Sequence, residues 1–238
     1  MIDFTRYKAL TFDCYGTLID WETGILNVLR PWADDKGFKL TDERLLEDYA
    51  QAESKVEELM PGVLYSDLLR EVMNEMAAGY GIAPDPDAAE TLAMSVGEWP
   101  AFDDTAEALG KLKKKFKLVI ISNVDRVSFA RSNEKLGVSF DAIITAEDAG
   151  AYKPDMRPFL IAFDVLEEMG IQRGEILHVA QSLFHDHVPA KALGLATVWV
   201  DRRRGREGWG ATPPPPVEVR PDLVVANLDE LAKITGWH

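Results

Sequence analysis

The sequence predicts an α/β protein with a parallel sheet and a helical segment inserted into it. Short apolar runs rich in β-branched residues alternate with helix-like segments, which is typical of a sheet covered on both faces. The long interval between the first run and the second contains only helical patterns. Polar side chains follow several runs directly, at the strand ends where such sheets bind ligands.

Six apolar runs predict the strands of the sheet. They lie at residues 8–13, 117–122, 141–146, 175–180, 196–201 and 222–227. Helix-like segments precede or follow them at residues 103–116, 126–137, 156–170, 187–194 and 228–234. Right-handed crossovers between parallel strands place the carboxyl ends of all strands along one edge of the sheet.

The interval after the first strand predicts a helical domain. Patterns with helical spacing occur at residues 23–37, 41–60, 65–81 and 85–99. We expect a core formed by residues 1–20 and 98–238, and a helical cap domain at residues 21–97 that lies over the edge where Asp13 emerges. The proline-rich stretch at residues 209–221 predicts an extended surface connection.

Composition limits the function classes. The chain has 238 residues, of which 47% are hydrophobic and 28% charged, and a formal net charge of -14. This charge opposes binding to nucleic acid or to an anionic membrane. The N-terminus lacks the pattern of a secretory signal, so we expect a cytoplasmic protein. The single Cys14 excludes an internal disulfide, and no Cys/His pattern suggests zinc.

Polar residues gather at the predicted strand ends. They are Asp13, Tyr15 and Thr17 after the first strand, Ser122 and Asn123 after the second, Lys153 after the third, and Gln181, Ser182 and Asp186 after the fourth. Each of them alone could cap a helix or bind loop backbone. Together they predict a catalytic site, because a buried carboxylate and a buried ammonium need each other for charge balance.

The motifs FDCYGTL, ISN, YKP and HVAQSLFHDHVPAKALGL, in this order around an inserted cap, resemble the haloacid dehalogenase-like superfamily. The resemblance implies a Rossmann-like core and a nucleophilic Asp13. Most members are Mg²⁺-dependent phosphatases, with a second aspartate two residues after the nucleophile and an acidic metal ligand in the fourth motif. Tyr15 and Gln181 stand at these positions here, so a phosphatase that needs Mg²⁺ becomes the alternative.

The form DxYGT is similar to the L-2-haloacid dehalogenase branch, which uses no metal or other cofactor. The resemblance implies that Asp13 attacks the α-carbon of a small 2-substituted carboxylic acid and forms an ester. Lys153 would then keep Asp13 ionised, and Asp186 would hold or activate water. The remaining implied roles are hydrogen-bond donation by Thr17, Ser122 and Asn123, and substrate binding by Tyr15, Trp21 and Ser182. Relatives of this type often form homodimers.

The identity of the leaving group stays open. The branch has an arginine in the second cap helix that receives the halide, but this segment has only Arg44 near its start, and Asp48 and Tyr49 follow. The motifs are also similar to a relative that opens the ring of L-azetidine-2-carboxylate, where the leaving atom is nitrogen. An acidic or aromatic pocket, with Asp20 and Trp21, would suit such a cation.

The remaining marked residues have structural interpretations. We expect His178, inside an apolar run, to be a packed core histidine. His185 and His187 flank Asp186, and they either tune it or begin the next helix. The arginines at residues 202–206 predict a solvated turn rather than a border of the site.

Overall fold

The computed structural model describes residues 2–236, and it confirms the α/β fold. A six-stranded sheet has the order β3-β2-β1-β4-β5-β6, and every neighbouring pair is parallel. The strands are β1 (Ala9–Phe12), β2 (Lys117–Ser122), β3 (Ala142–Thr145), β4 (Ile176–Ala180), β5 (Ala196–Val200) and β6 (Leu223–Val225). All six lie inside the predicted runs, and β1 takes a central place between β2 and β4.

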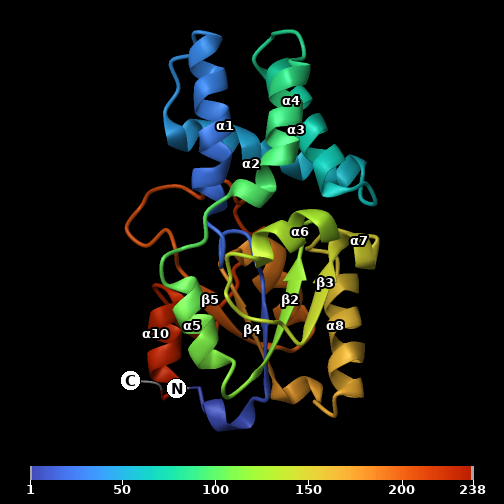
Figure 1. Ribbon diagram of the computed structural model, residues 1–238, viewed down its shortest axis with the longest axis vertical. Helices are drawn as coiled ribbons and strands as arrows, with labels where there is room; N and C mark the ends of the chain where they lie inside the picture. Colours follow the sequence, from blue (N-terminus) through green and yellow to red (C-terminus); the bar gives the residue numbers. More distant parts are fainter. Residues whose placement is uncertain (1, 237–238) are drawn as a thin grey trace.

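Helices cover both faces of the sheet (Figure 1). They are α5 (Thr105–Leu112), α6 (Arg126–Asn133), α7 (Ala146–Ala149), α8 (Arg157–Glu168), α9 (Val188–Ala192) and α10 (Leu228–Ile234). On one face, Phe159 and Phe163 of α8 pack against Val119 and Ile121 of β2. On the other, Leu109 and Leu231 belong to the larger apolar cluster that includes Leu118 and Ile120. This burial on both faces explains why the strands read as continuous apolar runs.

Four helices follow β1, as the sequence predicts, and residues 21–95, which contain them, are here called the cap. They are α1 (Trp21–Asp35), α2 (Asp42–Leu59), α3 (Tyr65–Gly79) and α4 (Pro86–Ser95). Figure 1 shows them together beyond the end of the sheet toward which the strands point. The side chains of Asp20, Thr41 and Asp85 cap the amino ends of three of them. Although α2 is the longest, no helix within residues 2–236 is long and apolar enough to cross a membrane.

The chain leaves the core and returns to it through two adjacent segments. Ile19 forms isolated bridges with Tyr15 and with Ala101, and the Asp20 amide donates to the Pro100 carbonyl at 2.7 Å. Next to this joint, Trp99 packs against Gly24, where a Cβ atom would lie 2.2 Å from the indole ring. The joint therefore fixes where α1 starts relative to the end of β1.

Candidate active site

Asp13 follows β1 directly and is 5% exposed. Its Oδ1 accepts a hydrogen bond from Lys153 Nζ at 2.9 Å, and its Oδ2 accepts one from Thr17 Oγ1 at 2.5 Å. Burial raises the pKa of Asp13, the Lys153 ammonium opposes this rise, and the Asp186 carboxylate adds to it. The lysine and the threonine therefore both orient the Asp13 carboxylate and favour its ionised form.

Lys153 is the buried cation of the site, with 1% of its surface exposed. Its ammonium donates to Asp13, to Asp186 Oδ1 at 2.7 Å and to the Ile121 carbonyl at 2.9 Å. These three bonds use all of its donors. Burial alone would lower the pKa of Lys153, but the Asp13 and Asp186 carboxylates raise it to about 12. Lys153 thus stays charged across the physiological range.

Asn123 holds the backbone of Lys153 in place. Its Oδ1 accepts from the Lys153 amide at 2.6 Å, and its Nδ2 donates to the Lys153 carbonyl at 3.1 Å. The same Nδ2 donates to Glu57 of α2 at 3.1 Å. Ser122 lies at the end of β2, fully buried, and its Oγ has no hydrogen-bond partner within residues 2–236. Among the expected donors, Thr17 is the one that bonds to Asp13 in this arrangement.

Asp186 is fully buried on a π-helical turn, Leu183–His187. Its Oδ1 accepts from Lys153 and lies 3.0 Å from His178 Nε2, while His178 Nδ1 lies 2.9 Å from Thr11 Oγ1. Burial disfavours the charged form, yet Lys153 and His178 together hold the pKa of Asp186 well below its ordinary range. His178 is buried as expected, but it also orients Asp186, a function that the apolar run around it did not indicate.

Tyr15 presents its ring, and not its hydroxyl, to the site. The hydroxyl donates to Ser132 Oγ at 2.8 Å, and the ring packs edge to face on Trp99 with centroids 5.6 Å apart. Burial raises the pKa of Tyr15 well above its ordinary value. Gln181 contributes its backbone to the site, because its amide donates to Thr17 Oγ1 at 2.8 Å. Its side-chain Oε1 accepts from Thr212 at 3.2 Å.

A cavity of about 30 Å³, here called the Asp13 cavity, connects these groups to the cap. Trp21 and Ser182, both predicted to bind substrate, line it together with Tyr15. The other lining residues are Asp13, Glu53, Glu57, Tyr65, Asn123, Val124, Lys153, His185, Asp186 and Thr212. Core and cap therefore both form its wall.

Two glutamates of α2 form the acidic part of this wall, and the sequence analysis missed them. Glu53 and Glu57 are 3% and 8% exposed. Glu53 Oε1 accepts from Tyr49 at 2.9 Å and from Tyr65 at 2.7 Å, and Glu57 lies 3.6 Å from His185 Nε2. Tyr49, Glu53 and Glu57 recur at helical spacing on the buried face of α2, but this spacing does not indicate that the face meets the core. Asp20, the acid that the sequence suggests for this pocket, caps α1 and does not line the Asp13 cavity.

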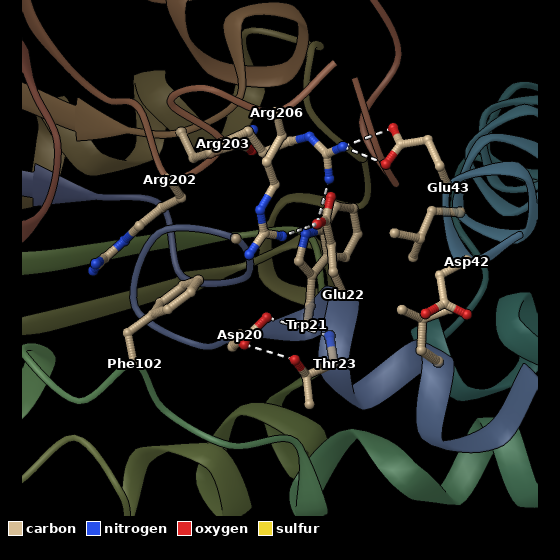
Figure 2. Close-up of a pocket in the computed structure, with 14 residues that line it drawn as sticks. Asp20, Trp21, Glu22, Thr23, Asp42, Glu43, Phe102, Arg202, Arg203 and Arg206 are labelled. Atoms are coloured by element: carbon tan, nitrogen blue, oxygen red, sulfur yellow. Dashed lines mark hydrogen bonds and ion pairs between the residues drawn. The ribbon is translucent and has the colours of Figure 1, made fainter. Parts of the chain in front are cut away.

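A second pocket of about 190 Å³, here called the outer pocket and drawn in Figure 2, shares Trp21 with the Asp13 cavity as a lining residue. Arg203 crosses from core to cap there: it pairs with Glu22 of α1 and with Glu43 of α2, both at 2.5 Å. Arg202 pairs with Asp104 at 2.7 Å. The expectation of a solvated turn is wrong for these two arginines, because cap and core carboxylates bury them to 9% side-chain exposure.

Within residues 2–236, no group of three or more His, Cys, Asp or Glu side chains is arranged to hold a metal ion. The facing Oδ1 atoms of Asp13 and Asp186 are bound instead by the ammonium of Lys153.

The fold and the site define an α/β hydrolase with a cap inserted after the first strand. The family model for haloacid dehalogenase-like hydrolases matches residues 7–194, and the chain belongs to this family.

Relatives of known activity agree with this assignment. The chain is 25% identical over 230 residues to an (S)-2-haloacid dehalogenase of Pseudomonas putida, covering 94% of this chain and 95% of that one. It is 29% identical over 210 residues to (S)-2-haloacid dehalogenase 4A of Burkholderia cepacia, with 85% and 86% covered. The L-2-haloacid dehalogenase of Xanthobacter autotrophicus with chloropropionic acid covalently bound has the same fold. Its TM-score is 0.76 at 21% identity, and 98% of this chain and 100% of that chain are covered.

Proposed function

We propose that this protein is a metal-independent hydrolase in which Asp13 attacks the α-carbon of a small 2-substituted carboxylic acid and forms a covalent ester. Water then attacks the Asp13 carbonyl carbon and releases a 2-hydroxy acid. The arrangement of Lys153 carries this proposal: one buried ammonium binds both Asp13 and Asp186 and keeps a carboxylate nucleophile charged in a small cavity.

Asp186 is the best candidate for holding the hydrolytic water. Its Oδ1 is engaged by Lys153 and His178, whereas its buried Oδ2 has no hydrogen-bond partner within residues 2–236. Because Asp186 lines the Asp13 cavity, a water molecule bound to Oδ2 would be near the ester carbonyl. A carboxylate in this place can orient the water and take its proton.

Phosphatase chemistry fits the site less well. A phosphate monoester needs a proton on its leaving oxygen, and the side chain two residues after Asp13 is a phenol whose hydroxyl donates to Ser132. A halide leaves without a proton, so a dehalogenase needs no such group. The Mg²⁺-dependent phosphatase remains the alternative that the assay below must exclude. The domain boundaries, the cytoplasmic location and the homodimer stay predictions.

One observation favours a second candidate, the hydrolytic opening of L-azetidine-2-carboxylate. The cap residues that line the Asp13 cavity include Glu53 and Glu57 but no lysine or arginine. An acidic wall repels a departing halide and attracts a protonated ring nitrogen. The same Asp13 ester would form in both reactions, so the two candidates differ only in the leaving group.

A substrate panel tests the proposal. It contains 2-chloropropionate, fluoroacetate, L-azetidine-2-carboxylate and p-nitrophenyl phosphate, each assayed in EDTA and in Mg²⁺ with the wild type and Asp13→Asn. We expect turnover of at least one of the first three in EDTA, and none by Asp13→Asn. Hydrolysis of the phosphate ester that requires Mg²⁺ would instead establish the phosphatase.

A single turnover in heavy-oxygen water tests the ester. Mass spectrometry should find the label in a peptide that contains Asp13, because water attacks the carboxylate carbon and not the substrate. The hydroxy acid from this first turnover should contain no label. Label in the first product would show direct attack by water and would exclude the ester.

A further inference from the structure

The feature that the ester mechanism leaves unused is the pair Glu53 and Glu57. A carboxylate that is more than nine-tenths buried normally pairs with a cation, because burial disfavours its charge. Glu53 instead accepts hydrogen bonds from the neutral phenols of Tyr49 and Tyr65. Glu57 Oε2 lies 3.6 Å from Nε2 of His185, which is a cation only when it is protonated.

Another buried group indicates that this part of the cavity receives a ligand. His185 is 7% exposed and lines the cavity, and its Nε2, although 3.6 Å from Glu57, has no hydrogen-bond partner within residues 2–236. Aromatic rings of Tyr15, Trp21 and Tyr65 line the same space. Carboxylates combined with aromatic faces suit a protonated nitrogen, which binds both kinds of group.

We propose that Glu53 and Glu57 form the leaving-group site of this enzyme, which takes substrates whose departing atom is nitrogen or oxygen, and that Glu53 gives a departing oxygen its proton. Glu57, held by Asn123 Nδ2, attracts a basic leaving group. This inference rests on Asp13 as the nucleophile and adds the substrate class that the cap selects.

Protons and electrons are conserved over the two steps of the reaction. In the first, an Asp13 oxygen bonds to the α-carbon, and the bond from that carbon to the leaving atom breaks. The leaving atom keeps the electron pair: a departing oxygen takes the proton of Glu53, whereas a ring nitrogen that binds as the ammonium leaves as a neutral amine and takes none. In the second, water adds to the Asp13 carbonyl carbon, and the ester bond breaks. One water proton goes to the oxygen of the hydroxy acid. Asp186 takes the other, which returns to Glu53 after loss of an oxygen and is released to solvent after loss of a nitrogen.

The charges around Glu53 support its role as a proton donor at neutral pH. Burial, followed by the neighbouring Glu57 carboxylate, raises the pKa of Glu53 to about 7, while His185, Tyr65 and Tyr49 oppose the rise. Burial disfavours the charge of His185, but Glu57 still raises the pKa of that imidazole. The core groups facing this pair across the cavity are the carboxylates Asp13 and Asp186 and the ammonium of Lys153.

The test compares three leaving groups in the wild type and in two variants. The wild type, Glu53→Gln and the control Glu58→Gln, an exposed position on the same helix, are assayed with L-azetidine-2-carboxylate, glycidate and 2-chloropropionate. We expect the wild type to prefer the first two. Glu53→Gln should lower kcat for glycidate by about 100-fold or more, as expected for loss of a general acid, and change 2-chloropropionate turnover by less than about 3-fold. Glu58→Gln should match the wild type.

The pH profile of the wild type gives a measurement that does not depend on folding of a variant. Since the protonated form of Glu53 is the active one for a departing oxygen, kcat for glycidate should fall as pH rises through about 7. A flat profile from pH 6 to pH 9, turnover of the halide alone, or equal losses on all substrates in Glu53→Gln would overturn the inference. Activity of Asp13→Asn would instead overturn the ester mechanism on which it rests.

Discussion

Replacing Lys153 by methionine tests whether the buried ammonium holds the two carboxylates together. Its bonds to Asp13 and Asp186 are 2.9 and 2.7 Å long. At an effective dielectric constant of about 20, each such charge pair contributes an attraction of about 6 kcal/mol, which desolvation of the three groups largely offsets. Breaking a buried pair from one side typically costs about 3–5 kcal/mol, and we expect a loss in the free energy of unfolding of this size at pH 8.

The loss should depend on pH. Without the ammonium, burial raises the pKa of at least one of the two carboxyls in the folded protein above its unfolded value. The folded variant then binds more protons than the unfolded chain, so its stability falls as pH rises. Between pH 5 and pH 8 the variant should lose about 1.4 kcal/mol for each unit by which that pKa exceeds 5.

Urea unfolding at pH 5 and pH 8 measures both effects. Lys191→Met is the matched control, since Lys191 forms a partly exposed ion pair with Asp222, and it should lose no more than about 1 kcal/mol. Adding Asp186→Asn to Lys153→Met should restore part of the stability by removing one buried charge. Equal losses in Lys153→Met and Lys191→Met, or a loss in Lys153→Met that does not change with pH, would refute the role of Lys153.

Three further predictions concern the surroundings of the site. Tyr15→Phe should reduce stability by about 0.5–1.5 kcal/mol through the lost bond to Ser132, while kcat changes by less than about 3-fold; a larger change in kcat would make Tyr15 a proton donor. His178→Phe should raise the pKa of Asp186 and move the acid limb of the pH profile of kcat to higher pH. An acid limb at the same pH as in the wild type would contradict the orienting role of His178. Arg203→Met should remove the short ion pairs of two cap glutamates and speed hydrogen exchange at the starts of α1 and α2, with unchanged exchange as the contrary result.

The sheet could be predicted because its strands are buried on both faces. A run such as 117–122 has a side chain in an apolar layer at every position but the first, so its composition alone identifies a strand. Elements held by a few specific bonds could not be predicted in this way. The short helix α7 depends on the reciprocal bonds of Thr145 and Asp148, and the turn that carries Asp186 depends on Ser182, which accepts from the His185 amide.

The core half of the site could be predicted by a simple rule. Parallel strands end at a common edge, and Asp13, Lys153 and Asp186 follow three of them. The cap half could not, because no local rule states which face of α2 the cap turns toward the core. Glu53 and Glu57 look like solvated helix charges until Tyr65 and Asn123 are placed against them.

This division between core and cap has a consequence for specificity. Every side chain that bonds to Asp13 comes from the core, and the acidic wall facing it comes from α2. A substitution on the cavity face of α2 can therefore change which leaving group departs while Asp13 and Lys153 keep their geometry. Asn123 couples the two halves, because it binds Lys153 in the core and Glu57 in the cap. A cap that moved away from the core would break the bond to Glu57 and separate the nucleophile from the proposed proton donor.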